Sequence, residues 1–509
     1  MDHIPIDIKP VLWSCSFVLS RFWFTLENIV ISVICWFKAR QRVARITDPL
    51  LLNSATKLAF MIKNRQEDFE GALRRAREID DALDADDSVS AQTLTDKPFL
   101  GVPFTLKDCM MVNGLICTAG IVARRESRSS IDCVVVQRMR NAGAIMLAVT
   151  NVSEVCMWWE SHNNIYGRSN NPYDTRRIVG GSSGGEAALI AAAGSVIGIG
   201  NDIGGSLRMP AYFNGIFTHK PSAGLVSDEG IIPAAHGYQK EMCVAGPMCR
   251  YFEDIKPMFK VLAGPTVHRL HLDKPVELKS IRYFYMEEIV SPIVMPLSNT
   301  VRKSLKRVVQ YLERRHDVLC HRLDLPLVHW AFSLWANDIS CEHCGGPTFT
   351  QSMTDCRGDL SLPVEIVRWL CGRSEHTCPA LLLATLEKLQ SAQPGDSAVR
   401  SATLHAMRQR LQRALAELLG DDGVLLMATH PTPAPYHHQP IAQPFNATYT
   451  ALVNSLLLPA TAVPLGLDAS GVPTGIQVIA NRNQDRLCLR VAGELADAFG
   501  GWRPPNALC

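Results

Sequence analysis

The sequence predicts an α/β fold, a mixed β-sheet covered by helices on both faces, with a hydrophobic segment at the N-terminus. Residues 99–106 (FLGVPFTL) and 144–150 (AIMLAVT) are apolar runs typical of buried strands, and residues 132–139 between them have a helical pattern that begins at Asp132 as a cap and ends before Gly143. This strand, helix, strand order favours an α/β sheet. With 509 residues, 47% of them hydrophobic, the chain can bury a large core.

The first 45 residues differ from the rest. Residues 11–37 are rich in large apolar side chains and are followed by Lys38, Arg40, Arg42 and Arg45. Arg21 and Glu27 interrupt the run, so it falls short of the about 20 apolar residues of a clean membrane span. Two interpretations are open, a tilted or hairpin-like anchor and an interfacial amphipathic helix, beside a helix packed on the protein itself. A basic flank predicts that the chain beyond it lies on the cytoplasmic side.

Composition excludes other classes of protein. A net charge of +2 with 20% charged residues indicates no nucleic-acid partner. The 16 cysteines are scattered, which is typical of reduced thiols in an intracellular chain. Residues 341–344 (CEHC) have a C-x-x-C spacing, but no second pair follows, so we expect ordinary thiols and no metal.

Helices are predicted at residues 68–83, 301–314 and 402–419, and the second has apolar side chains on one face. Between the first helix and the next strand, residues 84–96 form a polar loop. The strand at 99–106 ends at Lys107 and Asp108. Taken alone, Lys107 is an exposed lysine, because lysine is mostly found at the surface.

The region 180–210 contains two serines flanked by glycines. Ser182 lies in GGSSGG, and Ser206 follows DIGG, 24 residues later. Between them we expect a helix at 186–193 and a buried strand at 195–199. Residues 180–184 match the G-x-S-x-G pattern, but residues 170–177 (NNPYDTRR) predict a turn instead of the strand that a nucleophile elbow requires. A flexible turn around Ser182 is an open alternative.

Ser206 is the stronger candidate. Glycine has no Cβ, so the backbone N–H groups of a glycine loop can approach a ligand closely. At the end of an apolar segment, consecutive N–H groups beside Ser206 can point at one oxygen, which is the outline of an oxyanion hole.

Further motifs accompany these serines. They are GVPFTLKD at 101–108, TNVSEVCMWWES at 150–161, YGRSNNPYD at 166–174, GGSSGGE at 180–186 and DIGGSLRMP at 202–210. With these motifs in this order, residues 99–264 and 420–502 resemble the amidase signature family of serine hydrolases, and within it the membrane-bound fatty-acid amide hydrolase 2 type. The resemblance implies the amidase signature fold for a catalytic domain at 46–509, after a membrane anchor at 1–45.

The resemblance also implies roles for individual residues. Ser206 is the nucleophile, Ser182 the bridging serine held by a cis peptide, and Lys107 the base that starts a Ser-Ser-Lys relay. A serine hydroxyl needs such a base, and lysine can act as one only when it is neutral, a form that burial favours. The implied oxyanion hole consists of the N–H groups of Ile203, Gly204, Gly205 and Ser206. Braces of the glycine loops are implied at Ser183, Asp202 and Arg208. Met157 and Trp158 line either the pocket floor or the core.

The implied activity is hydrolysis of fatty-acid primary amides and N-acyl ethanolamines to a free fatty acid and an amine, without metal or organic cofactor. The implied partners are a lipid amide substrate and a membrane, with the catalytic domain on the cytoplasmic side, and a homodimer is possible. The alternatives are an amidase or esterase of small soluble substrates and a non-catalytic amidase-like binding protein. An amidase subunit of a glutamyl-tRNA amidotransferase is disfavoured because it would be soluble and need partner subunits.

The chain departs from this family near residues 63–70. A helical stretch that family members usually carry before the lysine strand is missing, and the predicted helix at 68–83 follows almost directly. Such a helix would normally cover apolar surface, so the deletion bears on folding and not on the catalytic positions.

Overall fold

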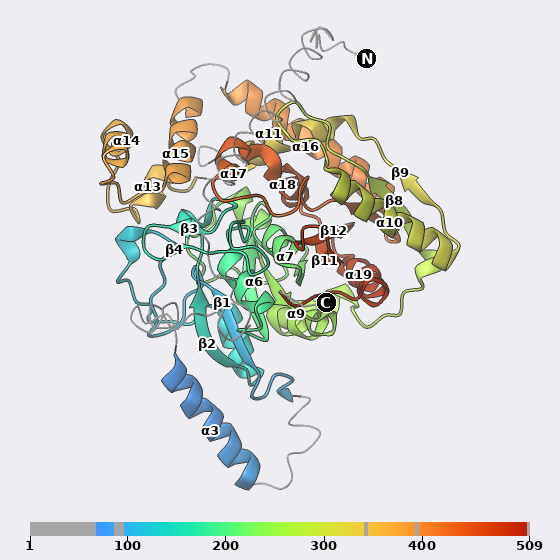
Figure 1. Ribbon diagram of the computed structural model, residues 1–509, viewed down its shortest axis with the longest axis horizontal. Helices are drawn as coiled ribbons and strands as arrows, with labels where there is room; N and C mark the ends of the chain where they lie inside the picture. Colours follow the sequence, from blue (N-terminus) through green and yellow to red (C-terminus); the bar gives the residue numbers. More distant parts are fainter. Residues whose placement is uncertain (1–67, 86–95, 341–344, 392–396, 506–509) are drawn as a thin grey trace.

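The computed structural model describes residues 68–85, 96–340, 345–391 and 397–505 (Figure 1). The predicted N-terminal anchor and the C-x-x-C residues lie outside these ranges. Within them, no helix combines the length and the hydrophobicity that a membrane crossing requires.

A ten-stranded mixed sheet forms the centre of the molecule, which confirms the predicted α/β class. Its order is β2-β1-β5-β7-β6-β11-β12-β10-β8-β9. The strands are β1 Pro103–Lys107, β2 Ile145–Thr150, β5 Ile197–Asp202, β6 Phe217–Lys220, β7 Val244–Cys249, β8 Arg282–Met286, β9 Cys320–Arg322, β10 Gly423–Met427, β11 Ala460–Leu467 and β12 Pro473–Ala480. β1 pairs in parallel with both β2 and β5, so the carboxyl ends of β1 and β5 meet at one edge. The middle of the sheet, from β5 through β7, β6, β11 and β12 to β10, is antiparallel.

Side chains alternate between the two faces of the sheet, as the pleat of a strand requires. In β10, Val424 and Leu426 belong to one core, and Leu425 and Met427 to another. The first core includes side chains of α5 Val134–Asn141, α9 Ile255–Ala263, α10 Asn299–His316 and α19 Asp485–Phe499. The second includes side chains of α7 Arg208–Asn214, α11 Ala331–Ile339, α16 Ser397–Leu419 and α18 Thr448–Ser455. Helices thus cover both faces.

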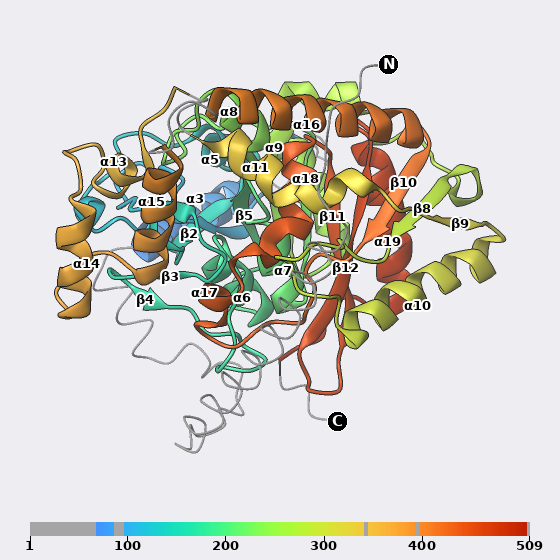
Figure 2. The ribbon, with the colours of Figure 1, turned by 90° about the horizontal axis from the view of Figure 1, so that it is seen from above.

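Three shorter helices stand together at one end of the molecule, opposite β9 and α10 (Figures 1 and 2). They are α13 Phe349–Met353, α14 Leu362–Leu370 and α15 Cys378–Ser391. The imidazole Nδ1 of His376, just before α15, lies 2.7 Å from the Glu154 carboxylate, which ties this group to the body of the domain.

A further helix, α3 Phe69–Ala85, extends from the edge of the sheet at β2 (Figure 1). Ala72 and Ile79 pack against Ile145, and the Asp68 N–H donates to the Leu147 carbonyl. The helix predicted at 68–83 is confirmed. The deletion inferred before it stays a prediction, because the preceding residues are not described.

Other element boundaries differ from the predicted ones for identifiable reasons. The first strand begins at Pro103, because residues 98–101 form a turn in which Gly101 has a φ of +75°. The helix expected from Asp132 begins at Val134, and Asp132 does not cap it: its carboxylate accepts the Asn113 N–H instead. The strand expected at 195–199 extends to Asp202, because Asn201 and Asp202 find buried polar partners.

Candidate active site

Lys107 is the last residue of β1 and is 1% exposed, so its interpretation as a surface lysine is wrong. Its Nζ donates to Ser182 Oγ at 2.6 Å and to Asn201 Oδ1 at 2.5 Å. Asn201 is on the neighbouring strand β5. The parallel pairing of β1 and β5 therefore brings the lysine to the partners that orient it.

Ser182 lies immediately before α6 Gly184–Ala191, at the end of a cis peptide bond from Gly181. No strand precedes it, which confirms the predicted turn. The glycines here are required by close packing, because a Cβ on Gly181 would lie 2.5 Å from the Trp158 carbonyl oxygen. Ser182 is 1% exposed, and its Oγ lies 3.0 Å from Ser206 Oγ.

Ser206 lies between β5 and α7, and the three predicted catalytic residues form one hydrogen-bonded line: Lys107 Nζ, Ser182 Oγ, Ser206 Oγ. The line ends in a cavity of about 550 Å³. Most of the cavity lining is apolar, with side chains from four parts of the chain: Met157, Ile232, Phe332, Trp335, Phe349, Leu383, Leu386 and Leu404.

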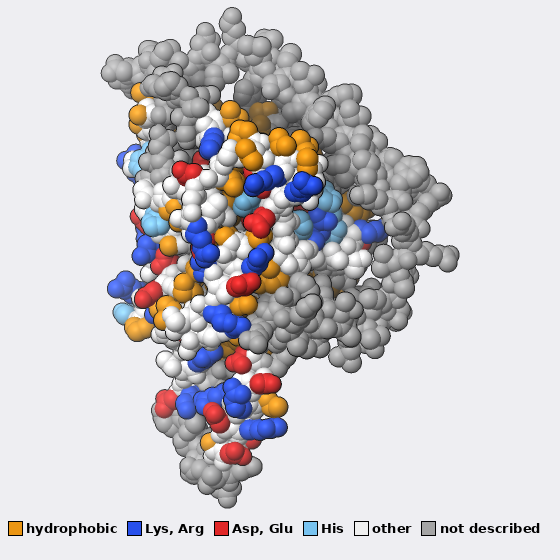
Figure 3. Space-filling model, turned by 90° about the vertical axis from the view of Figure 1, so that its left-hand side faces the viewer, with side chains coloured by type: hydrophobic (Ala, Val, Ile, Leu, Met, Phe, Trp, Pro, Cys, Tyr) orange, Lys and Arg blue, Asp and Glu red, His pale blue; other side chains and the backbone are white. Residues whose placement is uncertain are grey.

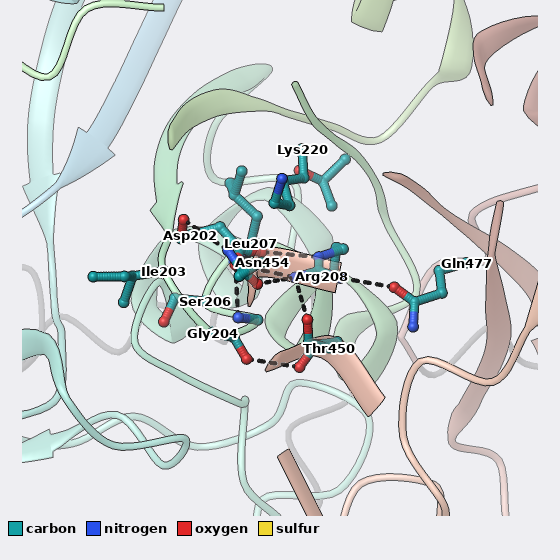
Figure 4. A network of polar contacts seen from close by, with 12 residues as sticks. Asp202, Ile203, Gly204, Ser206, Leu207, Arg208, Lys220, Thr450, Asn454 and Gln477 are labelled. Carbon is teal, nitrogen blue, oxygen red and sulfur yellow. Dashed lines mark hydrogen bonds and ion pairs between the residues drawn. The ribbon is translucent and has the colours of Figure 1, made fainter. Parts of the chain in front are cut away.

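The glycine loop after β5 is held from several sides (Figure 4). The Gly205 N–H donates to Asp202 Oδ1 at 2.6 Å, and the Gly204 carbonyl accepts from Thr450 Oγ1 at 2.8 Å. Within the described part of the chain, the N–H groups of Ile203, Gly204 and Ser206 have no protein acceptor. These three stay predicted oxyanion donors, whereas the N–H of Gly205 is already engaged.

Asp202 and Arg208 form an ion pair whose two side chains are both 0% exposed. Arg208 Nε lies 3.0 Å from Asp202 Oδ2, and Arg208 also donates to Gln477 Oε1 at 2.8 Å (Figure 4). Burial alone would raise the pKa of Asp202, but the charge and hydrogen bonds of Arg208 outweigh it and lower that pKa to about 2. The pair stays charged at neutral pH and fixes the loop that precedes Ser206.

Ser183, the third predicted brace, contacts the same region through the backbone. Its N–H donates to the Ser206 carbonyl at 3.3 Å, and its Oγ donates to the Asn201 carbonyl at 3.4 Å. The structure therefore brings all the predicted site residues together around one pair of serines.

Met157 and Trp158 have different surroundings. Met157 lines the catalytic cavity and also a neighbouring cavity of about 620 Å³, whereas Trp158 lines the neighbouring one alone. Of the two interpretations left open by the sequence, a pocket position is correct for both residues. The larger cavity contains none of the three residues of the hydrogen-bonded line, so we place the chemistry in the smaller one.

A family model for amidases matches residues 61–489 of this sequence. The chain belongs to the amidase family. It is 42% identical over 493 residues to human fatty-acid amide hydrolase 2, covering 91% of this chain and 92% of that protein. It is 41% identical to Danio rerio fatty-acid amide hydrolase 2-A, with coverage of 91% and 92%. A crystal structure of an amidase superposes with a TM-score of 0.66 at 26% identity, covering 89% of this chain and 97% of that one.

The family, the fold and the relatives together make this amidase an amide hydrolase, and they confirm the resemblance noted in the motifs. Within the described residues, no group of three histidine, cysteine or acidic side chains is arranged to hold a metal ion.

Sequence reasoning missed two residues that support the site of this amidase. Asn201 directly orients Lys107, and the only available signal was its position next to Asp202. Glu186 is fully buried behind the lysine strand, where Thr105 and Thr150 donate to its carboxyl group. Burial raises the pKa of Glu186 to about 8, so this group holds its proton at neutral pH. A single acidic residue in an apolar helix was its signal.

Proposed function

We propose that this amidase hydrolyses fatty-acid amides, both primary amides and N-acyl ethanolamines, with Ser206 as the nucleophile. The observation that carries the proposal is the buried line from Lys107 through Ser182 to Ser206, which opens into an apolar cavity. The products are a free fatty acid and ammonia or ethanolamine.

The relay begins with proton transfer away from Ser206. Neutral Lys107 takes the proton of Ser182 while Ser182 takes that of Ser206, and the hydroxyl hydrogens can rotate to suit this direction. The oxygen of Ser206 then attacks the amide carbonyl carbon. The relay runs in reverse to protonate the leaving amine, and water hydrolyses the acyl-enzyme with the same base.

The tetrahedral intermediate carries a negative charge on the former carbonyl oxygen. The N–H groups of Ile203, Gly204 and Ser206 are the donors we assign to it, since they have no protein acceptor in the described residues. Loss of one such donor typically lowers kcat by about 10²–10³-fold. The ion pair of Asp202 and Arg208 keeps the loop in place before the charge develops.

Two observations support a fatty acyl group. The cavity beside Ser206 is lined mostly by apolar side chains, and relatives that match over nine-tenths of their length are named fatty-acid amide hydrolases. An apolar cavity stabilises an acyl chain by removing its methylene groups from water, at about 0.8 kcal/mol for each.

We also propose that the protein associates with a membrane. On α14, the side chains of Val367 and Leu370 are 60% and 72% exposed, and on the adjacent α15 Leu386 and Leu389 are 47% and 61% exposed. The latter two also line the catalytic cavity. Figure 3 shows hydrophobic side chains gathered on the upper part of this side of the molecule, where α13–α15 lie in Figure 1. Exposed apolar side chains beside the cavity suit a substrate that enters from lipid.

The test is release of fatty acid from oleamide and from an N-acyl ethanolamine by the detergent-solubilised protein, with Ser206→Ala as the control. We expect turnover that the substitution abolishes. Absent turnover with retained fluorophosphonate labelling of Ser206 would contradict the substrate class and indicate smaller amides or esters. Absent labelling would contradict the nucleophile and favour a non-catalytic protein.

A further inference from the structure

Trp335, on α11, makes two contacts with the glycine loop that precedes Ser206. Its indole Nε1–H donates to the Ile203 carbonyl at 2.8 Å. Its ring also lies directly against Gly204, where a Cβ would come within 2.8 to 3.0 Å of three ring atoms. The absence of a side chain at position 204 is therefore matched to the indole of Trp335.

These contacts act on the peptide unit that joins Ile203 to Gly204. In a planar trans peptide, the carbonyl and the N–H point in opposite directions. The indole therefore holds the carbonyl end, and its position determines where the N–H of Gly204 points. That N–H is one of the oxyanion donors we assign above. A hydrogen bond at the carbonyl also polarises the peptide and strengthens its N–H as a donor.

The other braces of this loop differ from Trp335 in their surroundings. Thr450 donates to the Gly204 carbonyl, and Asp202 accepts the Gly205 N–H, but neither side chain lines the catalytic cavity. Trp335 lines it, together with Phe332, whose ring centroid lies 5.7 Å away. A bound acyl group would thus contact the same side chain that orients the oxyanion donor.

We infer that Trp335 is a positioning residue for amide hydrolysis, whose indole N–H aligns the Gly204 N–H with the oxyanion of the tetrahedral intermediate. The inference rests on the proposed function in that Ser206 is the nucleophile. It predicts that Trp335 stabilises the transition state more than it stabilises bound substrate, because the oxyanion exists only after attack.

A pair of substitutions separates the N–H from the bulk of the side chain. In Trp335→His, imidazole Nε2 occupies the same place in a five-membered ring as the indole Nε1, whereas Trp335→Phe keeps an aromatic ring without any N–H donor. We expect Trp335→Phe to lower kcat for oleamide by about ten-fold, between the effects of one neutral hydrogen bond and of one lost oxyanion donor. Trp335→His should retain most of the wild-type kcat. Phe332→Leu is the control for the cavity wall and should change KM more than kcat.

Binding measurements provide a second readout. An oleoyl trifluoromethyl ketone adds Ser206 and places an oxyanion in the hole, whereas oleic acid does not. Affinity of Trp335→Phe for the ketone should fall in proportion to kcat/KM, with a change of about two-fold or less for oleic acid. Equal losses in Trp335→Phe and Trp335→His, or equal losses for ketone and acid, would overturn the inference and leave Trp335 as a wall of the cavity.

Fluorophosphonate labelling keeps this test independent of the substrate. If the wild-type protein labels at Ser206 but does not cleave oleamide, the proposed substrate fails, and the labelling rate of Trp335→Phe relative to Trp335→His still decides the role of the N–H. A ratio near one would overturn it.

Discussion

Lys107 Nζ lies 2.6 Å from Ser182 Oγ, although 75 residues separate them in the sequence. Two secondary structure elements create this contact. β1 carries the lysine to its carboxyl end, and the turn before α6 presents the serine at the same edge of the sheet. Neither residue belongs to a short motif that would identify a catalytic pair, yet both side chains are buried within reach of Ser206.

Replacing Lys107 tests the base of the relay. Lys107→Ala should lower the rate of fluorophosphonate labelling of Ser206 at neutral pH by about 10²–10⁴-fold, because no other described side chain in the line accepts a proton. Mass spectrometry of labelled protein over time gives the rate. The control is Lys260→Ala, which removes an exposed lysine paired with Asp273. Labelling of Lys107→Ala at the wild-type rate would show that the base has been misassigned.

The Asp202 and Arg208 pair should be important for stability. Asp202→Asn leaves the guanidinium buried without its counter-charge, so we expect the free energy of unfolding to fall by about 3–5 kcal/mol. Urea denaturation at pH 7, followed by circular dichroism, measures this. Glu78→Gln is the control, because Arg75 and Glu78 form a pair with 47% and 62% exposed side chains and should contribute less than about 1 kcal/mol. Similar losses in the two variants would contradict the proposed role of burial.

The same pair predicts an acid dependence. The pKa of Asp202 is lowered from 3.8 to about 2 in the folded protein. An acid with a depressed folded-state pKa contributes stability that is fully present above its unfolded value and is lost as the pH falls through the folded one. The stability difference between wild type and Asp202→Asn should therefore be constant above about pH 5 and shrink toward pH 2. A difference that shrinks already between pH 7 and pH 5 would contradict it.

Glu186 predicts a dependence of the opposite sign. Its pKa is raised from 4.5 to about 8, so between these values the folded protein holds a proton that the unfolded chain has lost. Stability should fall as the pH rises across this interval, by a few kcal/mol at most, on the order of 1.4 kcal/mol per pH unit. Glu186→Gln keeps an uncharged side chain of the same shape, so its stability should lack this decline. Parallel pH profiles for the two proteins would show that Glu186 does not titrate there.

The apolar side chains on α14 predict membrane binding. The double variant Val367→Ser with Leu370→Ser should bind less to phosphatidylcholine vesicles in a sedimentation assay, because these two side chains are 60% and 72% exposed. Leu319→Ser is a matched control, since Leu319 is 66% exposed but lies between α10 and β9, at the opposite end of the molecule. Equal binding of both variants would exclude α14 as the contact and favour the N-terminal segment.

Much of the site was predictable because its residues are close to one another in the sequence. Ser182, Ser183, Asp202, Ser206 and Arg208 fall within 27 consecutive positions, and their glycines restrict the backbone that carries them. The α/β class followed in the same way from the apolar periods of the strands and the helix between them. Asn201 and Trp335 were not predictable, because no local pattern distinguishes an asparagine in a strand or a tryptophan in a helix from a core residue.

The sequence by itself determined the family, the sheet and the serines, since these depend on local pattern and on the spacing of motifs. Only the tertiary structure decided that Lys107 is buried, that Asp132 pairs across a loop instead of capping a helix, and that the Gly205 N–H is occupied by Asp202. Each of these outcomes depends on atoms contributed by segments far apart in the chain. Long-range packing fixes their distances, and packing is the property that a local sequence pattern does not contain.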